Sequence, residues 1–139
     1  MPHSPRLWNG RLWLLNSGCG ELGFVEFGAA PKFQTVAFCP GFVRGLGFHG
    51  KYAFVGLSKP RYQRFEGLDL DRRLREADSE PWCGVQVIDL TTGACVQWFR
   101  IDGAVAELYD VAVVAGCSQP MALGFANDEI LSFITHENV

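Results

Sequence analysis

The sequence predicts an all-β protein built from antiparallel four-stranded sheets. Apolar residues fall in short runs that end at glycine or asparagine, which is typical of many short strands joined by turns. The 139 residues include 16 glycines and 11 phenylalanines, and helical periodicity is nearly absent. With 48% hydrophobic residues the chain can bury a core, and its length suits a single β domain over residues 1–139.

The first part of the chain predicts a partial sheet over residues 7–40. Three strand candidates lie in it, over residues 12–15, 22–27 and 33–38. The first two flank a glycine-rich turn, which favours a hairpin, and the third is bounded by prolines. Pro2 and Pro5 precede these strands, and we expect that segment to be extended and rigid.

The second part predicts a complete sheet over residues 41–102. Its four strand candidates are residues 42–48, 51–57, 84–90 and 94–101. Gly93 can adopt the positive φ that a three-residue hairpin between the last two strands requires. An extra strand over 108–115 and an ambiguous tail are expected to make up residues 103–139.

Charged residues gather in one stretch inside the second sheet. Residues 61–80 hold five arginines and six acidic residues. We interpret residues 59–82 as a polar insertion, a solvated surface loop with one short helix near 69–77. The acids offset the arginines, and the whole chain has a net charge of −3, so we expect no nucleic-acid partner.

A weak internal repeat points to a more specific architecture. Residues 12–25 resemble 85–98 as strand, glycine turn and strand, and residues 40–46 parallel 102–108. Propeller blades are four-stranded antiparallel sheets that bury both faces against their neighbours. The sequence therefore predicts about two propeller-like blades. Because such blades leave apolar faces uncovered, we expect a homo-oligomer that assembles through them.

Seven short motifs occur in a fixed order along the chain. They are Met-Pro-His-Ser-Pro-Arg at 1–6, Gly-Arg-Leu-Trp at 10–13, Asn-Ser-Gly at 16–18, Pro-Gly-Phe-Val-Arg-Gly-Leu at 40–46, Ala-Phe-Val-Gly-Leu-Ser at 53–58, Cys-Gly-Val at 83–85 and Glu-Leu-Tyr-Asp-Val at 107–111. Together they resemble an uncharacterised bacterial family, a domain of unknown function. The resemblance implies a propeller-like all-β fold and no known activity. Because members of that family are longer, the chain resembles a partial, C-terminal segment of one.

The cysteines and the N-terminus set expectations for compartment and cofactors. The five cysteines are odd in number and form no C-x-x-C pair, so we expect buried free thiols, and Cys19 alone sits in a turn. The three histidines do not cluster with any cysteine, so we expect no metal site and no cofactor. Without a signal segment or an apolar span, the expected location is cytoplasmic, with no membrane partner.

Candidate binding residues lie near the N-terminus and the first turn. His3 and Arg6 precede the first predicted strand, where they either anchor the segment or contact a ligand. Asn16 lies at a hairpin tip, where turn chemistry alone can explain it.

A second set of candidates centres on Arg44. This arginine lies inside an apolar strand, so it needs a partner, and Glu107 and Asp110 are the candidates. Either the pair is structural or Arg44 binds an anionic ligand. Ser58 and Arg61 follow a strand end, where the loops of a rigid scaffold often carry binding.

Interpretations of different classes follow from these residues. The first is a non-enzymatic module that binds a small molecule or a protein, or only assembles. The alternative is an enzyme or small-molecule site at a channel mouth, built around Arg44, His3 and Glu107. No nucleophile–base pair is visible in the sequence, which favours the first. A fragment without a role of its own is a third interpretation.

Overall fold

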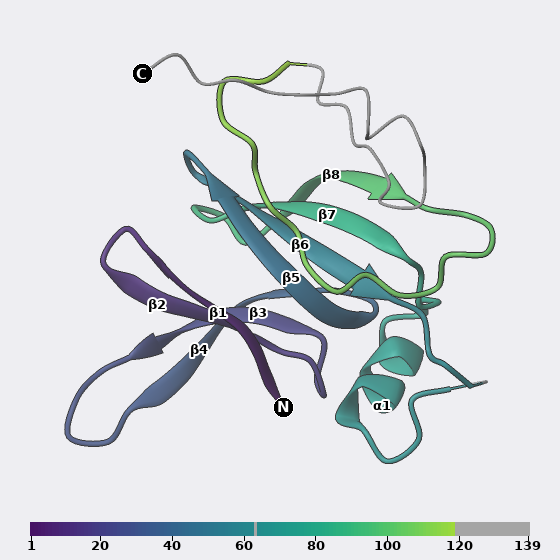
Figure 1. The fold of residues 1–139 in the computed structure, drawn as a ribbon. Helices are drawn as coiled ribbons and strands as arrows, with labels where there is room; N and C mark the ends of the chain where they lie inside the picture. Colours follow the sequence, from purple (N-terminus) through teal and green to yellow (C-terminus); the bar gives the residue numbers. More distant parts are fainter. Residues whose placement is uncertain (63, 119–139) are drawn as a thin grey trace.

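The computed structural model describes residues 1–62 and 64–118, which form two antiparallel four-stranded sheets and one helix (Figure 1). The first sheet has the order β1-β2-β3-β4, with strands Pro2–Trp8, Arg11–Asn16, Glu21–Glu26 and Lys32–Phe38. The second has the order β5-β6-β7-β8, with strands Phe42–His49, Tyr52–Ser58, Gly84–Asp89 and Cys95–Arg100. Helix α1, Asp69–Glu76, connects β6 to β7. The predicted all-β class, with four-stranded antiparallel sheets and one short helix, is confirmed.

The first sheet has one strand more than the three expected over residues 7–40. The N-terminal segment is not only extended but pairs with β2 as strand β1. Its prolines are compatible with this because β1 is the edge strand, where a missing N–H leaves no ladder bond unmade. A bulge between His3 and Arg6 accommodates Ser4 at a positive φ of 49°.

The segment after the second sheet also differs from the expectation. Residues 108–115 form no strand, and the tail from residue 119 lies outside the described residues. Residues 106–113, called the crossing segment below, lie instead over glycines of β5 and β6. A Cβ added to Gly45 would lie 2.4 Å from the backbone nitrogen of Val111, and one added to Gly56 would lie 3.0 Å from the Val111 side chain. The segment therefore packs over glycine positions of β5 and β6, where the absence of a side chain lets its backbone come close.

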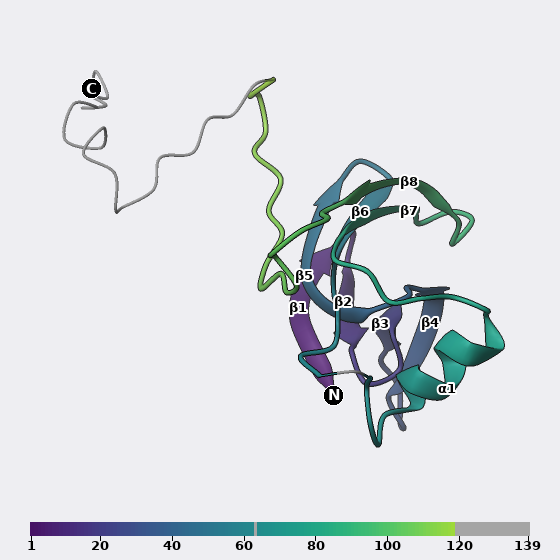
Figure 2. The ribbon, with the colours of Figure 1, turned by 90° about the vertical axis from the view of Figure 1, so that its right-hand side faces the viewer.

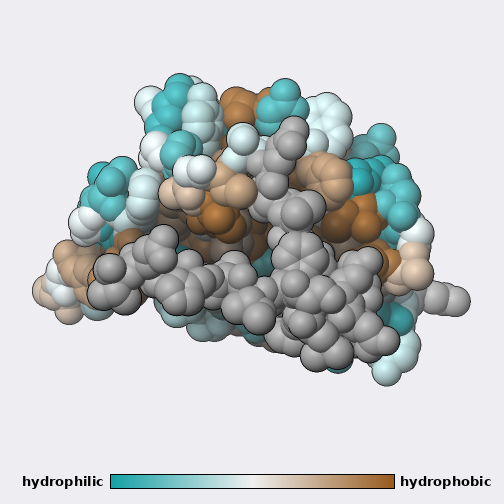
Figure 3. Space-filling model, turned by 45° about the horizontal axis from the view of Figure 1, so that its top comes forward, coloured by the Kyte–Doolittle hydropathy of each residue, from teal (hydrophilic) through white to brown (hydrophobic). Residues whose placement is uncertain are grey.

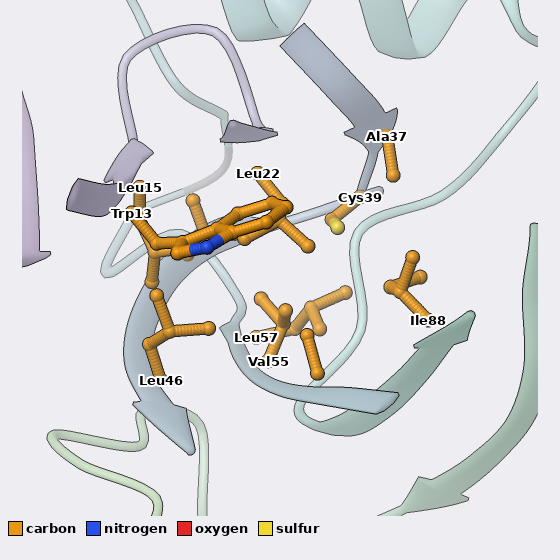
Figure 4. Close-up of a cluster of buried hydrophobic side chains, with 11 residues drawn as sticks. Trp13, Leu15, Leu22, Ala37, Cys39, Leu46, Val55, Leu57 and Ile88 are labelled. Carbon is orange, nitrogen blue, oxygen red and sulfur yellow. The ribbon is translucent and has the colours of Figure 1, made fainter. Parts of the chain in front are cut away.

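The main core lies between the two sheets. Leu15 and Leu22 from the first sheet meet Val55, Leu57 and Ile88 from the second, and all five are fully buried (Figure 4). Strands β1 and β5, the first strand of each sheet, lie side by side (Figure 2). The two sheets therefore meet at their first strands and enclose this core between them. Burial of large aliphatic side chains is the main stabilising term of such a pair of sheets.

The polar insertion is less solvated than expected. Leu70 and Leu74 of α1 are buried together with Phe65, and the backbone nitrogen of Leu70 donates to the carbonyl of Gly18 at 2.9 Å. The helix thus leaves the second sheet and packs on the first, beside β4 (Figure 2). The packing of α1 on the first sheet fixes the position of the residues that precede the helix.

Candidate functional site

A cavity of about 600 Å³ lies where the chain leaves β6, and it is called the Arg44 pocket below. Phe42 and Arg44 of β5 and Ser58 at the end of β6 line one side. Glu107 of the crossing segment and eight residues of the insertion complete it, namely Lys59, Pro60, Arg61, Tyr62, Arg64, Phe65, Glu66 and Leu68. The volume is in the range of small-molecule sites.

Four of the eight predicted site residues meet in this pocket. They are Arg44, Ser58, Arg61 and Glu107. The crossing segment brings Glu107 into place, because its backbone is tied to the end of β6. The hydroxyl of Ser58 accepts from the Leu108 nitrogen at 3.0 Å, and the Lys59 nitrogen donates to the Ala106 carbonyl at 2.8 Å.

Glu107 is held by two hydrogen bonds from one guanidinium. Nε and Nη2 of Arg61 donate to the two carboxylate oxygens at 2.7 and 3.1 Å. These bonds lower the pKa of Glu107, with a smaller contribution from the charge of Arg44, and they raise the pKa of Arg61. The bidentate geometry fixes the orientation of both groups at the pocket wall.

Arg44 is bound much less completely. Its Nη1 lies 3.9 Å from Glu107, beyond hydrogen-bond distance, and its guanidinium carbon lies 5.1 and 5.6 Å from the ring centroids of Phe42 and Tyr109. Its Nε is buried and has no hydrogen-bond partner within the part of the chain that the structure describes. The side chain as a whole is still 24% exposed and lines the pocket, so its other guanidinium nitrogens can donate to a ligand oxygen.

The other four predicted residues lie outside the pocket. Nη2 of Arg6 donates to both carboxylate oxygens of Asp110 at 3.2 Å, so Asp110 pairs with Arg6 and not with Arg44. Asn16 accepts from the N-terminal amine of Met1 at 3.3 Å and donates to Glu21 at 2.9 Å, which is a structural role in the turn.

His3 does not line the pocket but contacts Phe42, one of the residues that do. Its ring packs edge-on against Phe42, with centroids 5.6 Å apart. Desolvation lowers the pKa of His3, and the positive charges of Arg44 and of the N-terminus lower it further. His3 is therefore close enough to Arg44 to report on the charge of that residue.

His3 is expected to titrate below its ordinary pKa of 6.5. Its neutral form is favoured in the folded chain, so protonation as the pH falls below 6.5 favours the unfolded state. Proton NMR of the imidazole against pH measures the value directly. In Arg44→Gln the pKa should move up towards 6.5, while in Arg11→Gln it should stay, because Arg11 packs on Phe24 of the first sheet. An unchanged pKa in Arg44→Gln would contradict the proximity of the two residues.

Sequence reasoning missed much of the pocket wall. Phe42, Lys59, Phe65 and Leu68 line it, and none was a predicted site residue. The last two reach it because α1 is anchored on the first sheet, where Arg73 pairs with Glu21. Apolar residues inside a charged stretch were the available signal, since a solvated loop has no need of them.

The described residues offer little to metal or thiol chemistry. Among residues 1–62 and 64–118 there is no group of three His, Cys, Asp or Glu side chains that could hold a metal ion. Burial raises the pKa of the Cys39 thiol to about 12. Cys19, the cysteine expected in a turn, has its sulfur 4.0 Å from an Asp69 oxygen, which is not the electropositive setting of a reactive thiol.

No helix in the described part of the chain has the length and apolarity needed to span a membrane.

Comparison with known proteins gives one match. Residues 1–123 match the model of a family described as "Domain of unknown function (DUF4915)". No curated protein and no solved structure matches the chain.

Proposed function

The chain belongs to the DUF4915 family, whose description names no activity. From its own residues we propose that it is a propeller-like, non-enzymatic module that binds a small anionic molecule in the Arg44 pocket. The Arg44 guanidinium, which lines the pocket and makes no hydrogen bond among the described residues, carries the proposal. An anionic oxygen at this group would form a charge-assisted hydrogen bond.

A repeated contact between successive units supports the propeller-like part of the proposal. The hydroxyl of Ser17, after β2, donates to the carbonyl of Val43 on β5 at 2.6 Å. The hydroxyl of Ser58, at the end of β6, contacts Leu108 of the crossing segment. The crossing segment therefore contacts the serine at the end of the second strand of the second sheet, as β5 contacts the serine after the second strand of the first sheet. Both β1 and β5 also carry a bulge near the middle of the strand. Radial repetition of this kind is how propellers are built.

The enzymatic alternative around Arg44, His3 and Glu107 has less support. The Glu107 carboxylate is occupied by Arg61, and His3 packs on Phe42 rather than lining the pocket. A general base must lie within hydrogen-bond reach of the proton that it takes. A binding role at Arg44 needs neither Glu107 nor His3 to be free.

Arg44→Gln is expected to weaken the binding of anions by at least about 10-fold, because a hydrogen bond to a charged group contributes about 1.5–3 kcal/mol. Thermal unfolding with paired probes tests this, using benzoate against benzamide and phenyl phosphate against phenol. The charged member of a pair should stabilise the wild-type protein, and its effect should largely disappear in Arg44→Gln.

Arg11→Gln is the matched control for that experiment. Arg11 also packs on an aromatic ring, 4.4 Å from the centroid of Phe24, but it lies outside the pocket. It should respond to the anions as the wild type does. If no charged probe stabilises the wild type, or if Arg44→Gln responds equally, the proposed function is wrong.

Self-assembly with a second copy is a further candidate, favoured by strand β8. This outermost strand of the second sheet is exposed throughout, with Trp98 and Phe99 both 66% exposed, and adjacent strand residues point to opposite faces. Figure 3, which tilts the top of Figure 1 forward, shows hydrophobic residues exposed between hydrophilic ones. Each face of this edge strand thus carries an exposed aromatic side chain, and an uncovered sheet edge can pair with a second copy.

Light scattering on a sizing column tests the assembly. We expect a discrete oligomer that a Trp98→Ser, Phe99→Ser double variant converts to monomer. A Leu7→Ser variant is the control, since Leu7 is an exposed apolar residue on β1 in the first sheet. A monomeric wild type would exclude this candidate without affecting the ligand proposal.

A further inference from the structure

The charges of the Arg44 pocket are not balanced, which bears on the chemical class of its ligand. Four cationic side chains line it, Arg44, Lys59, Arg61 and Arg64, against the two carboxylates of Glu66 and Glu107. Two of the cations are matched. Arg61 holds Glu107 as described, and Arg64 lies 3.1 Å from Glu66.

Two cations are left over. Arg44 is 3.9 Å from a carboxylate that Arg61 already occupies, and Lys59 forms none of the ion pairs found in the described part of the chain. Because both line the same cavity, a ligand there meets about two uncompensated positive charges. That excess favours a dianion over a monoanion.

The apolar wall of the pocket adds a second requirement. Phe42 and Phe65 stack with their ring centroids 6.2 Å apart at an interplanar angle of 27°, and Pro60 and Leu68 extend this surface. A bare inorganic anion would leave most of this wall and most of the 600 Å³ unused. A flat aromatic group fits beside stacked rings at small cost in conformational entropy.

Resting on the proposed function, we propose that the ligand is an aromatic phosphate monoester. Its phosphate carries two negative charges above the second phosphate pKa of about 6 and offers several oxygens to Arg44 and Lys59 at once. Its ring lies against Phe42 and Phe65. Arg44 provides the guanidinium that has no hydrogen-bond partner among the described residues, and Lys59 distinguishes a dianion from a monoanion.

Isothermal titration at pH 8 with three probes tests the two requirements separately. Phenyl sulfate has nearly the shape of phenyl phosphate but one negative charge, and methyl phosphate has the charge without the ring. We expect phenyl phosphate to bind at least about 10-fold more tightly than phenyl sulfate, since one additional charge-assisted hydrogen bond supplies that much. We expect it to bind more tightly than methyl phosphate as well, because only the phenyl ring buries apolar surface against Phe42 and Phe65.

The variant Lys59→Met, which keeps the length of the side chain, should lower the affinity for phenyl phosphate to that for phenyl sulfate and leave phenyl sulfate unchanged. Lys32→Met is the control, because Lys32 is exposed on β4 and outside the pocket. Circular dichroism of each variant checks that the fold is retained.

The outcomes separate this inference from the proposed function. Equal binding of phenyl sulfate and phenyl phosphate, lost in Arg44→Gln, would overturn the dianion and leave an anion site. Equal binding of methyl phosphate would overturn the aromatic requirement. A Lys59→Met variant that loses both phenyl probes equally would overturn the role of Lys59. Absence of any binding would contradict the proposed function itself.

Discussion

Leu15→Ala is expected to lower the free energy of unfolding by about 3–5 kcal/mol, since large-to-small substitutions in a core of this kind cost that much. Leu15 is fully buried on β2, opposite Leu22, in the cluster that joins the two sheets. Removing its side chain leaves a cavity that strands fixed on both sides cannot easily close. Equilibrium unfolding in urea, monitored by tryptophan fluorescence, measures the loss.

The matched control is Leu7→Ala. Leu7 lies on β1 of the same sheet but is 79% exposed, so its truncation should change stability by less than about 0.5 kcal/mol. Similar losses in the two variants would mean that the sheets do not pack through Leu15, and the arrangement of the fold would need revision.

Gly45→Ala is expected to be the other severe substitution, with an effect on the site as well as on stability. Gly45 has a φ of +78°, which costs a side-chain-bearing residue about 1–2 kcal/mol. In addition, the new Cβ would lie 2.4–2.7 Å from backbone atoms of Asp110 and Val111. The crossing segment must move away, and overpacking of this kind adds about 1–3 kcal/mol. Glu107 would then leave Arg61, so the pocket should lose its wall.

Gly10→Ala separates backbone strain from the clash. Gly10 has a similar φ of +73°, and nothing lies within 4 Å of a Cβ added there. Both variants should show the cost of strain, but only Gly45→Ala should also increase amide hydrogen exchange at residues 106–113. Equal exchange in the two variants would contradict the seating of the crossing segment on Gly45.

The local signals in the sequence predicted most of the fold correctly. The hairpin between β7 and β8 was evident because Gly93 permits the turn, and it adopts a φ of +73°. The helix was expected near 69–77 and is found at Asp69–Glu76. Strand β1 was missed because prolines normally argue against a strand, and only the edge position makes them acceptable.

The internal repeat was only partly informative. Residues 12–25 form β2 and β3, the second and third strands of their sheet, whereas residues 85–98 fall in β7 and β8, the third and fourth. The two hairpins share a turn signal but not a position. The comparison of 40–46 with 102–108 aligned Val43 with Val105, whereas the serine contacts of the structure are made to Val43 and to Leu108.

In the candidate site, too, contacts that a local sequence signal indicates could be predicted, and contacts that depend on long-range packing could not. The closeness of Arg44 and Glu107 could be predicted from the sequence, because a charged residue in an apolar strand requires a partner. The apolar wall could not be predicted from the sequence, because Phe65 reaches the pocket only through the packing of α1 on the first sheet. No sequence pattern indicates that an insertion in one sheet will anchor on the other.

The most direct test of the account follows the Nε–H of Arg44 by ¹⁵N-edited NMR while phenyl phosphate is added at pH 8, with the Nε–H of Arg11 as the internal reference. We expect the Arg44 resonance to shift in a saturable way as its guanidinium gains an anionic acceptor, while that of Arg11 stays in place. An Arg44 resonance that does not move at saturating ligand would contradict the claim that this residue binds the anion.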